Sequence, residues 1–175
     1  MAKKVISVRL SGQSIDQAIK DLEQYKKELS KKIQRFTEGL ANIGLNEATI
    51  RFTTAIYDGV NDVSVSLSGN GNEYIITAKG DAVAFIEFGS GITYNKDKPY
   101  PNPRPSGIVG IGEYGEGRGN RRAWYYKGEP GTNGIVQENG AVKTRGNPAA
   151  MPMWYATEEM KDSIAKLARE VFGND

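Results

Sequence analysis

The N-terminal part of the chain carries a regular apolar pattern. Large apolar residues recur every seven positions, and a second row follows four positions after the first. The two rows are Ile15, Leu22, Leu29, Phe36 and Ile43, and Ile19, Ile33 and Leu40. This spacing predicts a helix with one apolar stripe, which begins at a capping box of Ser14 and Gln17 and ends at Gly44.

The predicted helix is long for a chain of 175 residues. Its roughly 29 residues extend about 44 Å at 1.5 Å per residue. Part of the apolar stripe therefore either overhangs the core in solvent or contacts another element or another copy of the chain.

After Gly44 the pattern changes from helical to strand periodicity. Asn46 suits the N-cap of a second helix over residues 47–59. The residues of Val63–Leu67 alternate strictly between apolar and polar, as in a half-buried strand. A turn rich in glycine and asparagine leads to Glu73–Gly80, which predicts the returning strand of a hairpin.

The next segment, residues 81–89, fits either a helix or a strand. As a helix it is N-capped by Asp81, ended by Gly89, and buries one face, with Glu87 near the edge of that face. That face consists of Ala84, Phe85 and Phe88. As a strand it places Glu87 on the opposite side from its two neighbours. We favour the helix.

Residues 93–150 are rich in proline and glycine, and they predict an extended arm with local hairpins. Two strand-like stretches, 123–128 and 134–144, are separated by turns. Pro152 suits the first turn of a C-terminal helix that ends at Gly173. The elements together predict an α+β fold in a single domain, 1–175. In this fold the long N-terminal helix and the C-terminal helix pack on a small antiparallel sheet, and the arm is inserted within the domain.

Two residue types are missing from the sequence, and their absence limits the chemistry. The chain has no cysteine and no histidine, so thiolate nucleophiles, catalytic triads and most zinc sites are excluded. No apolar run reaches the roughly 20 residues of a membrane span, and the N-terminus does not resemble a signal peptide. We expect a protein of a cytoplasm-like compartment that is not an enzyme and has no cofactor, metal site or membrane contact.

Charge alternates along the chain although the net charge is only +2. Residues 1–44 carry 9 basic and 5 acidic side chains, and residues 46–95 carry 2 basic and 6 acidic ones. The basic excess returns in the arm and reverses again in the C-terminal part. Such segregation is typical of a self-associating protein, although a mixed solvated surface explains it equally well.

Two motifs in the arm have more than one interpretation. Gly110, Gly112 and Gly115 match G-x-G-x-x-G, but no strand precedes them and no helix follows, so we do not expect a dinucleotide site. Three arginines followed by three aromatic residues suit either single-stranded nucleic acid or a protein interface. They are Arg118, Arg121, Arg122, Trp124, Tyr125 and Tyr126.

Glu87 is the acidic residue that most resembles a catalytic carboxylate. General acid–base work needs a second acid, and Asp81 and Glu73 are the near ones in sequence. The structural interpretation is stronger: a carboxylate beside a glycine-rich turn accepts backbone N–H bonds or pairs with an arginine such as Arg104 or Arg145.

The order of these features resembles the neck and tail-completion (head–tail joining) proteins of long-tailed bacteriophages. The residues that carry the resemblance most specifically are Ile86–Gly91, "IEFGSG", and Gly146–Ala156, which open the last helix. On this basis we expect structural anchors at Glu87, Phe88, Gly89 and Gly91. We expect an interface that consists of Gly110, Gly112, Tyr114, Gly115, Arg118, Arg121, Arg122, Trp124, Tyr125 and Trp154.

The resemblance implies a structural protein of the virion neck or tail, assembled in the host cytoplasm. It implies a homo-oligomeric ring, of sixfold or twelvefold symmetry, between portal or connector proteins and tail proteins. DNA passes through the channel of such a ring without sequence-specific binding, and no enzymatic activity or cofactor is implied. Two alternatives remain: a tail-terminator ring, and a single-stranded nucleic-acid-binding module built on the arginine and aromatic motif.

Overall fold

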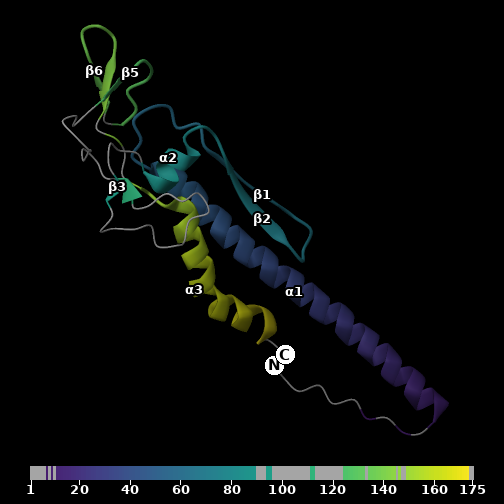
Figure 1. The fold of residues 1–175 in the computed structure, drawn as a ribbon. Coiled ribbons are helices and arrows are strands. Elements are labelled where there is room, and N and C mark those ends of the chain that lie inside the picture. Colours follow the sequence, from purple (N-terminus) through teal and green to yellow (C-terminus); the bar gives the residue numbers. More distant parts are fainter. Residues whose placement is uncertain are drawn as a thin grey trace.

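The computed structural model describes residues 7, 9, 11–89, 94–95, 111–112, 124–132, 134–144, 146 and 149–173. The described residues form an α+β fold, as the sequence predicts (Figure 1). The helices are α1 (Gly12–Thr54), α2 (Val83–Phe88) and α3 (Pro152–Phe172). The strands are β1 (Ser64–Gly69), β2 (Tyr74–Lys79), β3 (Tyr94–Asn95), β4 (Ile111–Gly112), β5 (Trp124–Tyr126), β6 (Ile135–Val136) and β7 (Val142–Thr144).

Helix α1 is one continuous helix of 43 residues, about 65 Å long, so the predicted break at Gly44 and the predicted N-cap at Asn46 are wrong. Gly44 is buried within the helix, where a Cβ atom would lie 2.6 Å from Met160 Sδ and 2.7 Å from Ile76 Cδ1. This glycine therefore allows α3 and β2 to approach α1 closely, which is a tertiary role that local sequence does not reveal.

The start of α1 lies three residues before the predicted capping box. Ser11 is the N-cap, and its Oγ accepts the backbone N–H of Ser14 at 3.4 Å. The Ser14 hydroxyl in turn accepts the backbone N–H of Arg9 at 2.9 Å. Gln17, the predicted partner of Ser14, instead donates to Asp21 Oδ1 at 2.9 Å. Ser11 and Ser14 thus cap the helix start, but Ser14 accepts from Arg9 and not from the N-cap residue itself.

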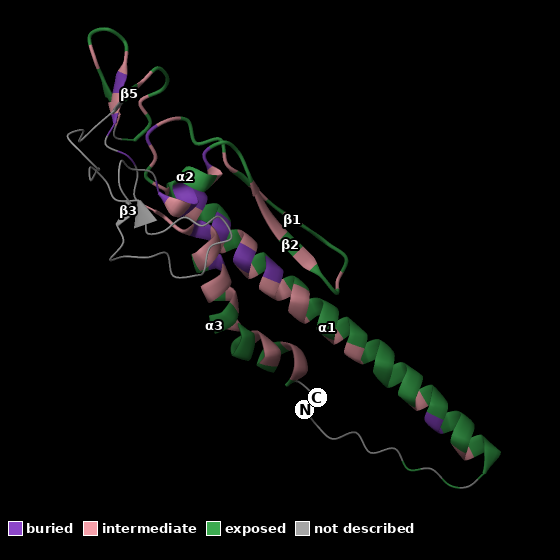
Figure 2. Ribbon diagram, in the orientation of Figure 1, coloured by how far each residue is buried: buried purple, intermediate pink, exposed green. Residues whose placement is uncertain are grey.

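Two elements cover the C-terminal half of α1 and leave its N-terminal half projecting (Figures 1 and 2). Helix α3 lies antiparallel to α1: Phe172 at its end packs on Phe36, with ring centroids 5.8 Å apart. The β1–β2 hairpin lies along α1 on another side, with Ser64 paired to Lys79 and Gly69 to Tyr74. The hairpin and the C-terminal helix, with Pro152 in its first turn and Gly173 after its end, confirm the sequence predictions.

The core lies where the end of α1 meets α2. Phe52, Ala82 and Ile86 form its fully buried centre. The predicted buried face of α2 is wrong, because Ile86 and Glu87 are buried whereas Phe85 is 49% exposed and stacks on Tyr57. The reason is that α2 has only six residues and seats Ile86 against Phe52, which turns Phe85 outward.

Five of the short strands fall within the predicted arm, much of which lies outside the described residues. Strands β3 and β4 pair with each other. Strands β5, β7 and β6 form a three-stranded antiparallel sheet with β7 in the centre. The strands and turns that the sequence predicts over 123–144 are present, and this sheet stands at the far end of the molecule from the start of α1 (Figure 1).

Candidate interaction site

Glu87 holds the start of α3. Its Oε2 accepts the backbone N–H of Met153 at 2.9 Å, and its Oε1 accepts that of Trp154 at 3.3 Å. The residue in the N-cap position, Met151, has a left-handed backbone with φ 51° and provides no side-chain cap. The carboxylate from α2 therefore takes the capping role at the first turn of α3.

This geometry assigns Glu87 one of the two partner types that the sequence leaves open, namely backbone amides. The Ile86 carbonyl also accepts the backbone N–H of Ala150 at 2.9 Å, so two successive residues of α2 hold the chain that enters α3. Phe88 ends α2, and Gly89 follows with φ 76°, a conformation that favours glycine. Gly91 lies outside the described residues.

A second carboxylate, from a residue well before α2 in sequence, caps the start of that helix. Asp62 Oδ2 accepts the backbone N–H of Asp81 at 2.7 Å, and Oδ1 accepts that of Ala82 at 3.0 Å. The predicted N-cap, Asp81, makes no side-chain cap, and α2 begins after Ala82. The hydrogen bonds from Ala82 and then Asp81 lower the pKa of Asp62 below its ordinary value of 3.8.

We expect Asp62→Asn to lower stability at neutral pH and to lose this effect in acid. The carboxylate contributes stability above its ordinary pKa of 3.8, and the contribution disappears as the pH falls through its lower folded-state pKa. Thermal unfolding measured from about pH 7 to about pH 2 should show the melting temperatures of variant and wild type converging. Asp162→Asn, an exposed acid on α3, is the control and should follow the wild type throughout. A deficit that stays constant with pH would contradict the assignment.

The loop after α1 fastens the three-stranded sheet to the helices. The Thr144 hydroxyl of β7 donates to Asp58 Oδ2, and both residues are buried. The backbone N–H of Thr132 donates to the Tyr57 carbonyl at 2.8 Å, and the Tyr57 N–H donates to Thr132 Oγ1 at 3.3 Å. Burial, followed by the negative charges of Asp62 and Asp81, raises the pKa of Tyr57, so its phenol is protonated at neutral pH.

The three-stranded sheet presents an exposed face with an aromatic and an apolar side chain. Tyr125, Lys143 and Ile135 lie directly opposite one another across β5, β7 and β6. We call this row the outer sheet face. Tyr125 and Ile135 are each 59% exposed, whereas Val142 and Thr144 on the other side of β7 are buried.

The predicted interface residues are distributed unevenly. Tyr125 lies on the outer sheet face, and the backbone of Trp124 pairs with Thr144. Trp154 lies on the first turn of α3 instead, with Lys161 Nζ 5.5 Å from its ring centroid. The backbone of Gly112 pairs with Tyr94 in the β3–β4 ladder. The others lie outside the described residues: Gly110, Tyr114, Gly115, Arg118, Arg121 and Arg122.

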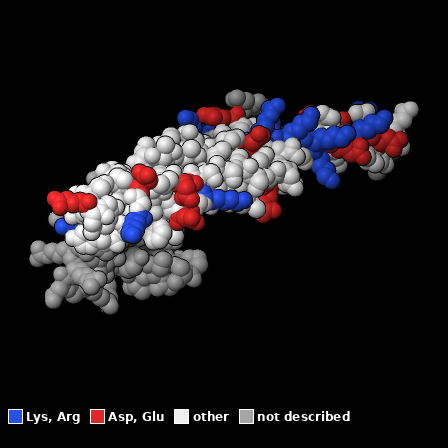
Figure 3. Space-filling model, turned by 90° about the horizontal axis from the view of Figure 1, so that it is seen from above, with Lys and Arg blue, Asp and Glu red and all other residues white. Residues whose placement is uncertain are grey.

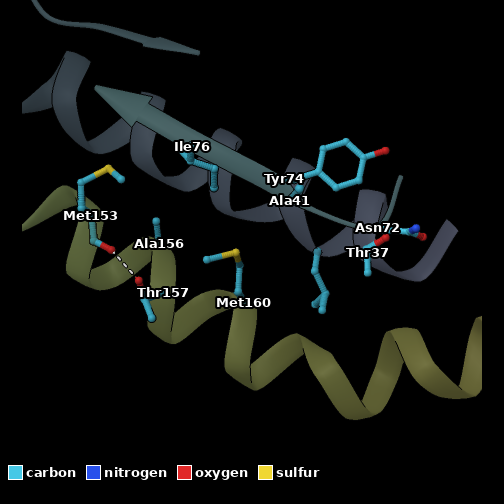
Figure 4. Close-up of a pocket in the computed structure, with 10 residues that line it drawn as sticks. Thr37, Ala41, Asn72, Tyr74, Ile76, Met153, Ala156, Thr157 and Met160 are labelled. Carbon is cyan, nitrogen blue, oxygen red and sulfur yellow. Dashed lines mark hydrogen bonds between the residues drawn. The ribbon is translucent and has the colours of Figure 1, made fainter. Parts of the chain in front are cut away.

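Sequence reasoning missed Ile135 as a surface residue, although its strand was predicted. Ile135 joins Tyr125 on one face because it pairs with Lys143 of β7, and this pairing is not visible in the local sequence. It also missed a groove of about 400 Å³ between α1, β2 and α3 (Figure 4). Apolar side chains such as Leu40, Ile76 and Met160 line most of it.

The described residues contain no cluster of three or more acidic side chains arranged to hold a metal ion. No helix among them is both long and apolar enough to cross a membrane. Comparisons with known protein families, with curated proteins and with solved structures each find no match.

Proposed function

We propose that this protein is a structural component of a bacteriophage virion, which forms an oligomeric ring at the head–tail junction. The observation that carries the proposal is the outer sheet face, where Tyr125 and Ile135 are exposed at one end of an elongated molecule. Exposed apolar and aromatic side chains at the end of a rigid element are typical of protein contacts. The resemblance of Ile86–Gly91 and Gly146–Ala156 to neck and tail-completion proteins directs the proposal to this assembly.

The hydrogen bonds around α2 support the same interpretation. Asp62 and Glu87 each cap a helix that begins far away in sequence, and Asp58 ties the sheet to the end of α1. The buried bond of Asp58 joins the sheet to the helical body, and the bonds of Asp62 and Glu87 fix α2 and the start of α3 within that body. A subunit built this way presents the outer sheet face in a defined orientation, as repeated head-to-tail contacts in a closed ring require.

Assembly of the purified full-length protein tests the proposal. We expect rings in negative-stain electron microscopy and native mass spectrometry, either alone or with the connector and tail proteins of the same virion. The double variant Tyr125→Ser with Ile135→Ser should stay folded but form no rings. Ile164→Ser, which replaces a 45% exposed residue on α3, is the control and should assemble. A wild-type protein that remains monomeric alone and with every virion partner would contradict the proposal.

A tail-terminator ring is the runner-up within the same class. A neck ring binds above the tail and a terminator caps the tail tube, so the position of the ring in a density map of the intact particle separates them. The same map counts the subunits and decides between sixfold and twelvefold symmetry.

A further inference from the structure

The projecting half of α1 carries an exposed apolar seam. Helix α3 ends beside Phe36, and N-terminal to that point Ile15, Ile19 and Leu22 are 45%, 50% and 54% exposed. Ile33, one turn before Phe36, is 41% exposed. Figure 2 shows this half of the helix as predominantly exposed.

The seam has the width of a coiled-coil contact. One row consists of Ile15, Leu22 and Leu29, and the other of Ile19, Lys26 and Ile33. These rows occupy two positions in seven, which suits one partner helix, whereas a helix packed on a globular core uses a broader face. The seam also continues the stripe that packs on α3 in the C-terminal half of α1.

Charge along the projecting half is segregated in the direction of the helix. Residues 12–23 contain one basic and three acidic side chains: Lys20, Asp16, Asp21 and Glu23. Residues 24–35 contain five basic and one acidic: Lys26, Lys27, Lys31, Lys32, Arg35 and Glu28. Figure 3 shows charged side chains of both signs gathered on this end of the molecule. A helix with this distribution is complementary to a copy of itself that runs in the opposite direction.

We propose that the projecting halves of α1 from two copies of this protein pair as an antiparallel two-stranded coiled coil. With the two-fold axis near residue 24, Ile15 packs on Ile33 of the second copy and Ile19 on its Leu29. Leu22 then faces Lys26 of the second copy. The ammonium group of that lysine reaches the carboxylate of Glu23, which is next to Leu22 on the first copy. Each of these layers occurs twice, so the seam contains six layers in all.

The parallel alternative is disfavoured by the same residues. In a parallel, in-register pair, Lys26 faces Lys26 within the seam, and the acidic segment lies along the acidic segment of the other helix. Like charges that face each other destabilise such a pair, and a lysine in the seam selects the orientation that provides it with an acidic neighbour. The antiparallel arrangement removes both conflicts.

This contact is two-fold, so it joins molecules in pairs and does not close a ring by itself. It uses the opposite end of the molecule from the outer sheet face and does not rest on the proposed function. A protein that pairs but never forms rings would overturn only the proposed function. A protein that forms rings but does not pair through α1 would overturn only this inference.

Sedimentation equilibrium of the full-length protein provides the first test. We expect the wild type to convert from monomer to dimer with rising concentration, and Leu22→Glu to weaken pairing by about 100-fold or more. Lys26→Glu should weaken it by about tenfold, whereas Lys27→Glu, an outward-facing neighbour with the same charge change, should alter it less than about threefold. Adding Glu23→Lys to Lys26→Glu should restore pairing. Circular dichroism checks that each variant keeps its helices.

Cysteine cross-linking tests the orientation, and the absence of natural cysteines makes it specific. Ile15→Cys and Ile33→Cys proteins, distinguished by size tags, are mixed and oxidised. Antiparallel pairing should give mainly the mixed disulfide dimer, because these two positions face each other in the proposed register. Disulfides only between identical variants would overturn the proposal, as would a wild-type protein that stays monomeric at every concentration.

Discussion

Replacing Glu87 with alanine should lower the free energy of unfolding by about 3 kcal/mol, because the first turn of α3 loses its acceptor. The carboxylate accepts N–H groups from both Met153 and Trp154 and is only 5% exposed. A hydrogen bond to a charged group contributes about 1.5–3 kcal/mol, and the negative charge is also attracted to the positive end of the helix dipole. Removing the side chain leaves two N–H groups without this acceptor and a void beside Met153.

Two further variants separate capping from simple loss of volume. Glu87→Gln keeps the size of the side chain but offers one oxygen in place of two, so we expect about half of the alanine effect. Glu159→Ala removes an exposed carboxylate from the same helix and should change stability by less than about 0.5 kcal/mol. Urea unfolding followed by circular dichroism gives the three values.

Hydrogen exchange gives a readout specific to the contact. The amides of Met153 and Trp154 should exchange faster in Glu87→Ala than in wild type, while those in the middle of α1 should change in proportion to global stability alone. An alanine variant as stable as the glutamate protein would show that the carboxylate does not hold α3.

The sequence predicts the elements of this fold better than the contacts between them. Periodicity identifies α1, the β1–β2 hairpin and α3, because each has enough residues to repeat an apolar pattern. The same rule fails at Gly44, where the glycine serves the close approach of Met160 and Ile76. Nothing in the local sequence distinguishes a glycine that ends a helix from one that admits a neighbour.

The helix caps likewise separate what local sequence predicts from what tertiary contacts decide. Sequence rules look for a cap within a few residues of the helix start. At the start of α1 they predict the correct type of cap, a serine hydroxyl, although the N-cap is Ser11 and its partner is Ser14. They fail for α2 and α3, whose capping carboxylates Asp62 and Glu87 come from other elements. The sequence leaves backbone amides and an arginine open as partners of Glu87, and identifying the two amides requires the position of α3.

The candidate surfaces depend on tertiary placement in the same way. The sequence indicates that α1 is too long for the core, and it predicts the strands that carry Tyr125 and Ile135. The pairing of β5 and β6 with β7 makes β7 the central strand, and the buried contact between Thr144 and Asp58 identifies the side of β7 that faces the loop after α1. The sequence predicts Tyr125 as a surface residue but not Ile135, and the pairing of both strands with β7 places the two side chains on one face.

That packing predicts the second large effect, which lies at Gly131. Its φ is 62°, and a Cβ atom added there would overlap the backbone of Tyr57 and Gly59 and lie 2.7 Å from the Cα of Asp58. All three are main-chain groups, so no side-chain rotation relieves the overlap. The turn can move away only by breaking the bonds between Thr132 and Tyr57.

Gly131→Ala should therefore destabilise the protein by about 3 kcal/mol or more, the sum of left-handed strain and steric overlap. Gly140→Ala is the matched control, since its φ is 75° but nothing lies within 4 Å of the added Cβ. Strain alone should cost about 1 kcal/mol there. The difference between the two variants in urea unfolding isolates the contact between the sheet and the loop after α1.

Hydrogen exchange in Gly131→Ala should locate the damage. If the turn separates from the loop, the buried contact between Asp58 and Thr144 weakens, and the β7 amides lose protection before those of α1. Equal effects at Gly131 and Gly140 would mean that the sheet does not press against the loop. A larger effect confined to Gly131 means that the orientation of the outer sheet face depends on a main-chain contact that only glycine permits.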